Sequence, residues 1–155
     1  MWGLKNMIDG VIKTALKQIH DERGKVMHML RATDPHFQKF GEVYFSWIYP
    51  DIIKAWHKHV NMTMNYTVPV GCIKLVLYDD RPNSKTYKEL NEYFLNDQDY
   101  FLLTIPPGLW YGFKAIGGNS AMIVNCSTIA HDPNEVLRIS PFDESIPYRW
   151  EVKHA

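Results

Sequence analysis

Residues 53–59, IKAWHKH, contain two histidines separated by one residue, His57 and His59. In a β-strand, residues i and i+2 point to the same face, so the two imidazoles would share one side of a strand. The same alternation places Lys54 on the other side. An imidazole can ligate a metal or transfer a proton near neutral pH, so either chemistry is open to this pair.

The residues around the pair argue against a metal site. Metal-binding β-barrels of the cupin type combine such an H-x-H pair with a nearby Glu and a later His. Here residues 61–64, NMTM, contain no carboxylate, and the position three residues after Gly108 is Tyr111. Catalytic and structural zinc sites need three or four protein ligands. We therefore expect no metal, and either a histidine that moves a proton or two solvated or structural histidines.

The composition is that of one soluble domain covering residues 1–155, with 46% hydrophobic residues. Lys plus Arg equal Asp plus Glu at 17 each, so no net field attracts nucleic acid or an anionic membrane. Cys72 and Cys126 lie in apolar runs, which indicates two buried, reduced thiols. No signal peptide or long apolar segment is present, so we expect a cytoplasmic protein.

Short apolar runs separated by Gly, Pro, Asn and Asp predict an all-β sandwich or barrel from about residue 40 onward. The expected strands cover residues 42–49, 51–60, 66–71, 72–79, 100–105, 109–116 and 121–129. The first 19 residues show a helical period that Gly10 interrupts. For that region we predict a short N-terminal helical turn over 3–9 and a strand over 11–19. A tight turn should then lie within 20–26.

Several motifs follow one another in a specific order: HDERGKV, IKAWHKH, VGCIKLVLYDDRPNSKT, LLTIPPGLWYGFKAI and HDPNE. This series, spread over roughly residues 10–150, resembles the dTDP-4-dehydrorhamnose 3,5-epimerase family. The resemblance implies a cupin-like jelly-roll β-barrel that forms a homodimer and needs no cofactor. It also implies a nucleotide-diphosphate-linked 4-keto-6-deoxy sugar as the substrate, most often dTDP-linked.

The resemblance assigns roles to individual residues. Asp21 and Arg23 fit the family's D-x-R-G turn, where Arg23 would suit a phosphate, although an ordinary turn with an ion pair is the alternative. Lys54 stands at the Arg of the family's R-G-L-H-F-Q strand, His57 at its catalytic base and His59 at its Gln. A further list of substrate-binding candidates comprises Arg81, from the D-x-R-x-x-S-x-T stretch, Glu42 and His131.

The implied reaction is an epimerisation at C3, C5 or both. The C4 ketone acidifies the neighbouring C–H bonds, His57 would remove a proton to give an enolate, and an acid on the opposite face would return one. Lys54 would stabilise the oxyanion or contact the diphosphate. Arg81 would either touch substrate or shape its turn.

The chain departs from the family in its acid and in the partner of its base. Ala130 stands at the family's acidic Tyr and is followed by His131, so Tyr111 is the nearest phenol, unless it only packs at the barrel mouth. The Asp that orients the family's histidine has no counterpart before Ala155, and Glu42 is a substitute candidate. A barrel that binds a nucleotide sugar without turnover, a sugar 3,4-ketoisomerase and a metal-dependent cupin remain alternatives.

Overall fold

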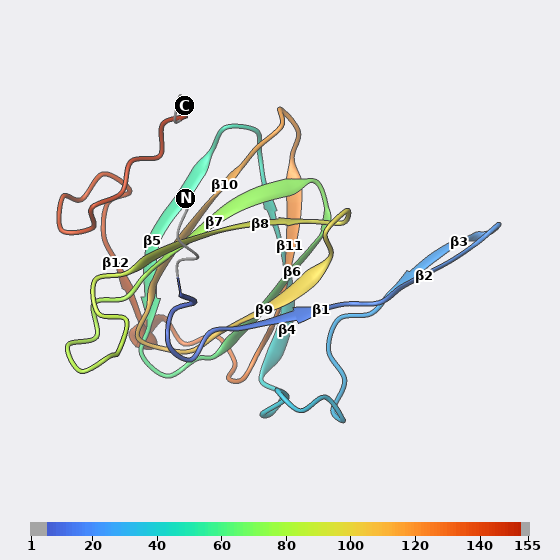
Figure 1. The fold of residues 1–155 in the computed structure, drawn as a ribbon, viewed down its shortest axis with the longest axis horizontal. Coiled ribbons are helices and arrows are strands. Elements are labelled where there is room, and N and C mark those ends of the chain that lie inside the picture. Colours follow the sequence, from blue (N-terminus) through green and yellow to red (C-terminus); the bar gives the residue numbers. More distant parts are fainter. Residues whose placement is uncertain (1–5, 153–155) are drawn as a thin grey trace.

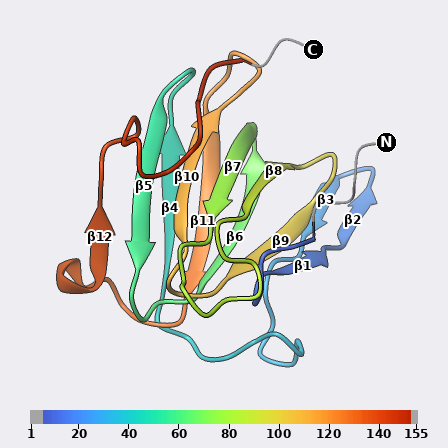
Figure 2. The same cartoon turned by 60° about the vertical axis from the view of Figure 1, so that its left-hand side comes forward.

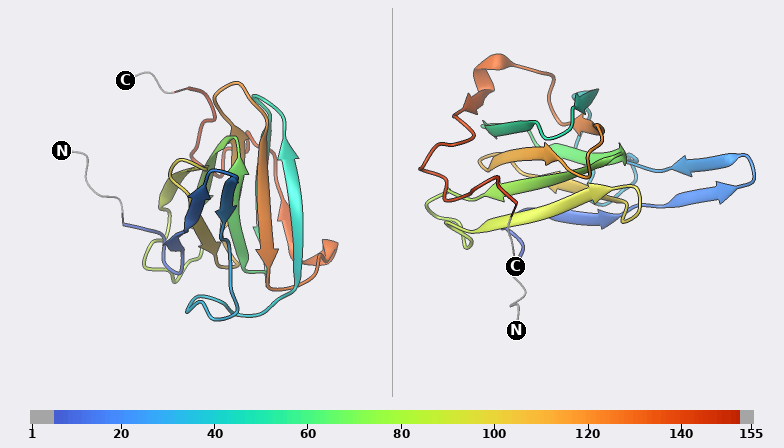
Figure 3. Two further views of the ribbon diagram at one scale, coloured as in Figure 1. Left: turned by 90° about the vertical axis from the view of Figure 1, so that its right-hand side faces the viewer. Right: turned by 90° about the horizontal axis from the view of Figure 1, so that it is seen from above.

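The computed structural model describes residues 6–152, which form two five-stranded antiparallel sheets and a separate β-hairpin (Figure 1). The first sheet has the order β1 (Ile12–Ala15), β9 (Phe101–Ile105), β6 (Met64–Val70), β11 (Ala121–Ser127) and β4 (Glu42–Ile48). The second has the order β12 (Val136–Arg138), β5 (Ile53–His59), β10 (Trp110–Ala115), β7 (Cys72–Tyr78) and β8 (Leu90–Asn96). The two sheets enclose the core, as Figures 2 and 3 show, so the expectation of an all-β, jelly-roll barrel is confirmed.

The core lies between the inner faces of the sheets and follows from the alternation of residues along each strand. On β7, Ile73, Leu75 and Leu77 are fully buried and point into the barrel. The intervening residues Val76 and Tyr78 are also buried, although they point outward. A second layer must therefore cover the outer face of this sheet.

That layer is the C-terminal segment, residues 139–150, which passes over β5 and β10 (Figure 2). Ile146 and Trp150 pack there against Trp56, Trp110 and their neighbours. The segment is also joined to β5 by paired backbone hydrogen bonds between Trp56 and Ile139. It thereby fixes the outer face of β5, the strand that carries the two histidines.

The outer face of the first sheet has no such layer within the described residues. Val43, Phe45 and Trp47 alternate along β4 and are 46%, 65% and 51% exposed. Phe45 pairs across the strands with Val124, and Trp47 with Met122, so these apolar side chains form one continuous surface. The described residues therefore leave an apolar strip along β4 open to solvent.

The N-terminal prediction was wrong in part. Residues 6–9 form no helix, residues 3–5 of the expected turn lie outside the described part, and the expected strand over 11–19 is two strands. β1 pairs with β9, and this sheet pairing overrides the helical period. The predicted tight turn is confirmed: it joins β2 (Gln18–Asp21) to β3 (Gly24–Met27), a hairpin that extends away from the barrel (Figure 1).

All seven strands expected after residue 40 form, within a few residues of the expected bounds. β8 and β12 were not predicted. Cys72 and Cys126 are free thiols, but each is half-buried and not fully enclosed. No helix in residues 6–152 has the length and apolar character needed to span a membrane.

Candidate active site

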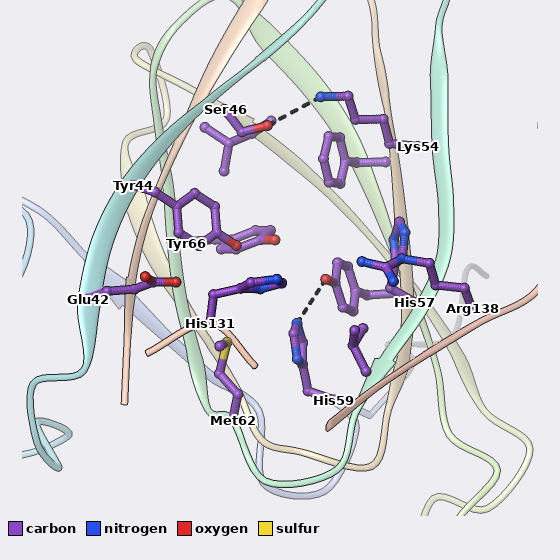
Figure 4. Close-up of a pocket in the computed structure, with 14 residues that line it drawn as sticks. Glu42, Tyr44, Ser46, Lys54, His57, His59, Met62, Tyr66, His131 and Arg138 are labelled. Atoms are coloured by element: carbon purple, nitrogen blue, oxygen red, sulfur yellow. Dashed lines mark hydrogen bonds between the residues drawn. The ribbon is translucent and has the colours of Figure 1, made fainter. Parts of the chain in front are cut away.

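A cavity of about 450 Å³ opens between the two sheets, and side chains from both line it (Figure 4). Six of the nine residues singled out from the sequence are among its lining. The full lining is Glu42, Tyr44, Ser46, Lys54, His57, His59, Met62, Tyr66, Tyr111, Phe113, Ile123, His131, Val136 and Arg138. Residues from six different strands and from the loops after β5 and β11 thus converge on one space.

Lys54 lies on the same cavity wall as the histidines, which corrects the expectation from simple alternation. Tyr111 pairs with His57 and Phe113 pairs with Lys54, so two residues of β5 oppose Gly112 alone. Such a β-bulge reverses the facing of every residue beyond it. Gly112 permits it, because a Cβ there would lie 2.4 Å from the Cβ of Ala55. The Lys54 amine donates to Ser46 Oγ (3.3 Å) and to a backbone carbonyl of β4 (2.8 Å).

His57 is a half-buried imidazole surrounded by cations. Burial lowers its pKa to about 4, and the charges of Arg138, His59 and Lys54, in that order, act in the same direction. Arg138 pairs with His57 in the register of β12 and β5. A pKa of about 4 leaves the ring neutral at physiological pH. The structure gives the His57 ring no hydrogen bond to any described side chain, so its lone pair is free to accept a proton.

His59 is buried and bonded at both ring nitrogens. Nδ1 contacts Oε1 of Glu135, and Nε2 lies 3.0 Å from the hydroxyl of Tyr111. The two rings are nearly parallel, with an interplanar angle of 11° and centroids 5.6 Å apart. Glu135, His59 and Tyr111 therefore form one hydrogen-bonded chain that ends at the cavity.

Glu135 is placed by a short turn between β11 and β12. Asp132 caps the 3-10 turn Pro133–Glu135 by accepting from the backbone N–H of Asn134, and the proline occupies the first position of the turn. The Oε2 atom of Glu135 accepts three backbone N–H groups, those of Val60, Asn61 and Met62. Burial opposes ionisation of the carboxyl group, but the bonds from Asn61, His59 and Met62 lower its pKa.

The opposite wall comes mainly from β4, whose residues Glu42, Tyr44 and Ser46 alternate into the cavity, and from His131 (Figure 4). The Tyr44 hydroxyl accepts a hydrogen bond of 3.0 Å from Asn125. Glu42 makes no hydrogen bond to His57 among the described residues, so the suggestion that it orients this histidine was wrong. The carboxylate that orients an imidazole is Glu135, and the imidazole is that of His59.

The other three candidates lie away from the cavity lining. Asp21 and Arg23 form an exposed ion pair of 2.6 Å at the tip of the β2–β3 hairpin. Arg81 binds both oxygens of the buried Asp79, each at 2.8 Å, in the turn after β7. Burial opposes ionisation there, but hydrogen bonds led by Arg81 lower the pKa of Asp79 to about 2. Arg81 therefore shapes its turn.

Sequence reasoning missed Glu135, Arg138 and Tyr44. The motif HDPNE contained Glu135, but nothing in it named His59 as the partner. Tyr44 could have been found, because residues 42, 44 and 46 share a strand face with period two. Arg138 carried no signal, since β12 is only three residues long.

The site offers proton transfer and anion binding. It joins a neutral imidazole, two cationic side chains and a buried phenol within one cavity. No group of three or more His, Cys, Asp or Glu side chains within residues 6–152 is arranged to hold a metal ion.

The sequence is similar to known proteins over almost its whole length. The family described as dTDP-4-dehydrorhamnose 3,5-epimerase matches residues 5–155. The spore coat polysaccharide biosynthesis protein SpsL of Bacillus subtilis is 32% identical over 149 residues, covering 95% of this chain and 99% of its own. The probable low-salt glycan biosynthesis epimerase Agl13 of Haloferax volcanii is 33% identical over 130 residues, covering 83% and 80%.

A solved structure shows the same fold at closer similarity. The dTDP sugar isomerase of Desulfovibrio desulfuricans G20 is 44% identical with a TM-score of 0.90, and the match covers 92% of each chain. The protein therefore belongs to the dTDP-4-dehydrorhamnose 3,5-epimerase family and is an enzyme that acts on carbohydrates.

Proposed function

We propose that this enzyme inverts C3, C5 or both in a nucleotide-diphosphate-linked 4-keto-6-deoxy sugar, through an enolate. The observation that carries the proposal is the state of His57: a neutral imidazole, free of hydrogen bonds to described side chains, in a cavity that also holds Lys54 and Arg138. A proton-abstracting base must be unprotonated and unobstructed, and the anion that it creates needs cations nearby.

His57 is the base in this proposal. It removes the proton next to the C4 ketone, the C–H electron pair forms the enolate, and negative charge develops on O4. Lys54 and Arg138 supply positive charge for that oxygen or for the diphosphate, which a guanidinium can bind through paired hydrogen bonds. A bound diphosphate would also offset the cations that lower the pKa of His57, and so strengthen the base in the complex.

Tyr111 hydrogen-bonds the sugar in this proposal. Its hydroxyl lies in the cavity wall beside His57, on the neighbouring strand, where it would donate to O4 of the enolate. Inversion needs a proton donor on the face opposite to His57, and Tyr44 and His131 stand on that side of the cavity (Figure 4). His131 and Glu42, on the other side of the cavity, would contact the sugar.

We infer a dTDP-linked sugar and a homodimer as partners. The first rests on the 44% identical relative, which is described as a dTDP sugar isomerase. The second rests on the exposed apolar surface of β4 and on the extended hairpin, which could carry Arg23 to the cavity of a second copy. We also expect a cytoplasmic enzyme, where the free thiols Cys72 and Cys126 would stay reduced.

Deuterium uptake tests the function directly. The enzyme is incubated in D2O with dTDP-, GDP- and CDP-linked 4-keto-6-deoxy sugars, mass spectrometry follows ring deuteration, and NMR identifies the inverted carbon. We expect uptake together with inversion at C3 or C5. Binding by calorimetry without any uptake would favour a non-catalytic barrel, and migration of the ketone would favour a 3,4-ketoisomerase.

A further inference from the structure

Three phenols line the cavity, and burial separates Tyr44 from Tyr66 and Tyr111. Burial raises the pKa of Tyr66 and of Tyr111 well above that of an ordinary phenol. A tyrosinate at either position would be poorly solvated, so both phenols resist giving up a proton. Tyr44 is only half-buried, so its surroundings oppose the loss of a proton least.

Tyr44 also stands across the cavity from His57. β4 belongs to the first sheet and β5 to the second, and the cavity opens between them. The Tyr44 side chain points into this space from one wall and His57 from the other (Figure 4). A planar enolate bound between the walls therefore has His57 over one face and Tyr44 over the other. Inversion requires this arrangement, because the proton must return on the face opposite to the one from which it left.

A buried amide fixes the direction of the Tyr44 hydroxyl. Asn125 on β11 is fully buried, and its Oδ1 atom accepts the backbone N–H of Asn65 at 3.0 Å. The amide nitrogen is therefore the end that faces Tyr44, and it donates to the hydroxyl oxygen at 3.0 Å. Because the phenol oxygen accepts this bond, its own hydrogen is available to the cavity. The same amide N–H would stabilise a tyrosinate after proton donation.

We propose that Tyr44 is the catalytic acid that returns a proton to the sugar on the face opposite to His57. The Tyr44 O–H bond breaks as the enolate's electron pair forms the new C–H bond and the C4 ketone returns. The tyrosinate accepts the Asn125 N–H and takes its next proton from water, which the half-exposed side chain can reach. The His57 imidazolium releases its proton to solvent, so the reaction consumes no net proton.

His131 is the other proton-carrying side chain on that side of the cavity (Figure 4). It is exposed, it lies in the loop after β11, and the structure gives its ring no hydrogen bond to any described residue. A general acid must be held within hydrogen-bond reach of the atom that it protonates. Tyr44 meets this requirement better, because it lies on a strand and is anchored by a buried amide.

The assignment rests on the proposed function, and one experiment separates the two. Each variant is incubated in D2O with a dTDP-linked 4-keto-6-deoxy sugar, mass spectrometry measures deuterium uptake, and NMR measures configuration. Tyr44→Phe keeps the ring but removes the proton, so exchange should continue through His57 while inversion falls by about 10²-fold or more. The variant should return deuterated substrate of unchanged configuration, which a merely structural defect would not produce. Tyr87→Phe, an exposed phenol outside the cavity lining, is the matched control.

Two companion variants test the neighbouring groups. Tyr111→Phe removes a donor to O4, so exchange and inversion should fall together, and His131→Asn should leave their ratio unchanged. Retained exchange with lost inversion in His131→Asn, but not in Tyr44→Phe, would overturn the assignment in favour of the histidine. Inversion at the wild-type rate in Tyr44→Phe, or a proportional loss of exchange and inversion, would overturn it as well. Absence of exchange in the wild type would instead reject the proposed function.

Discussion

His57 and His59 point from the same strand into the same cavity, yet the regions around them differ in hydrogen bonding and charge. Around His57 the neighbours are Arg138 and Lys54, and burial lowers its pKa to about 4. Around His59 both ring nitrogens are bonded, one to Glu135 and one to Tyr111.

The difference shows how one side chain acquires two tasks. A ring without hydrogen bonds among cations stays neutral and can accept a proton, whereas a ring bonded to a carboxylate and a phenol is fixed and holds that phenol in place. β12 supplies Arg138 to the first region, and the turn just before it supplies Glu135 to the second. Residues 133–138 therefore give different surroundings, and different roles, to two histidines that are only two positions apart.

Removing the base should produce the largest effect. We expect His57→Asn to abolish deuterium uptake and inversion together, a loss of about 10²–10⁴-fold in rate. A proton donor alone cannot generate the enolate when the base is missing. Mass spectrometry measures the uptake. Calorimetric binding of the substrate and the melting temperature should stay near wild type, and normal exchange in this variant would reverse the assignment of the two regions.

Gly112→Ala should disturb both regions through the backbone. The new Cβ would lie 2.4 Å from the Cβ of Ala55 and 2.9 Å from the Trp150 ring, so β5 must shift against β10. We expect a loss of about 1–3 kcal/mol in the free energy of unfolding, measured by urea denaturation. Adding Ala55→Gly removes the closer contact and should recover part of the loss; no recovery would mean that the bulge is not limited by this contact.

Arg138→Met should remove one of the positive charges that lower the pKa of His57. A wild-type base with a pKa of about 4 predicts that kcat/KM rises as the pH increases through that value. Removing the guanidinium makes the imidazolium less unfavourable, so the pKa of His57 rises and the acid limb moves to higher pH. The shift should be partial, because burial is the larger cause. Arg149→Met, an exposed change outside the cavity, should leave the limb in place.

The smallest effect concerns stability. The pKa of His57 falls from 6.5 to about 4 on folding, so between these pH values the unfolded chain binds more protons at this position. The free energy of unfolding should therefore decrease as the pH is lowered through this window. His57→Asn should show a smaller decrease than wild type in urea denaturation at both ends of the window. Equal decreases would mean that the ring titrates normally in the folded state.

Much of the fold was predictable, because it depends on local patterns. Period-two alternation and turn residues identified seven strands, including β4 and β5. The prediction of a helical turn near the N-terminus was wrong for the described residues. The helical spacing there was overridden when β1 paired with β9, about 90 residues away. β12 was missed since a three-residue strand has too little pattern to detect.

The candidate site was predictable in its members but not in its connections. Residue types and spacing drew attention to His57, His59 and Tyr111, and the resemblance added Lys54. Their partners were not visible: Glu135 is 76 positions from His59, and no local pattern relates the two. The exposed position of Arg23 and the turn-forming role of Arg81 were equally undecided until the chain was folded.

By itself, the sequence determined the β-rich class, the facing of His57 and His59, and the absence of the family's tyrosine at Ala130, since each depends on residue identity or on near neighbours. Only the tertiary structure decided which histidine is bonded and which is free. That choice depends on the β-bulge opposite Gly112, which turns Lys54 into the cavity, and on the turn Pro133–Glu135, which brings Glu135 next to His59. Both are contacts between segments far apart in the chain, and hydrogen bonding and burial in the folded state set the chemistry of each imidazole.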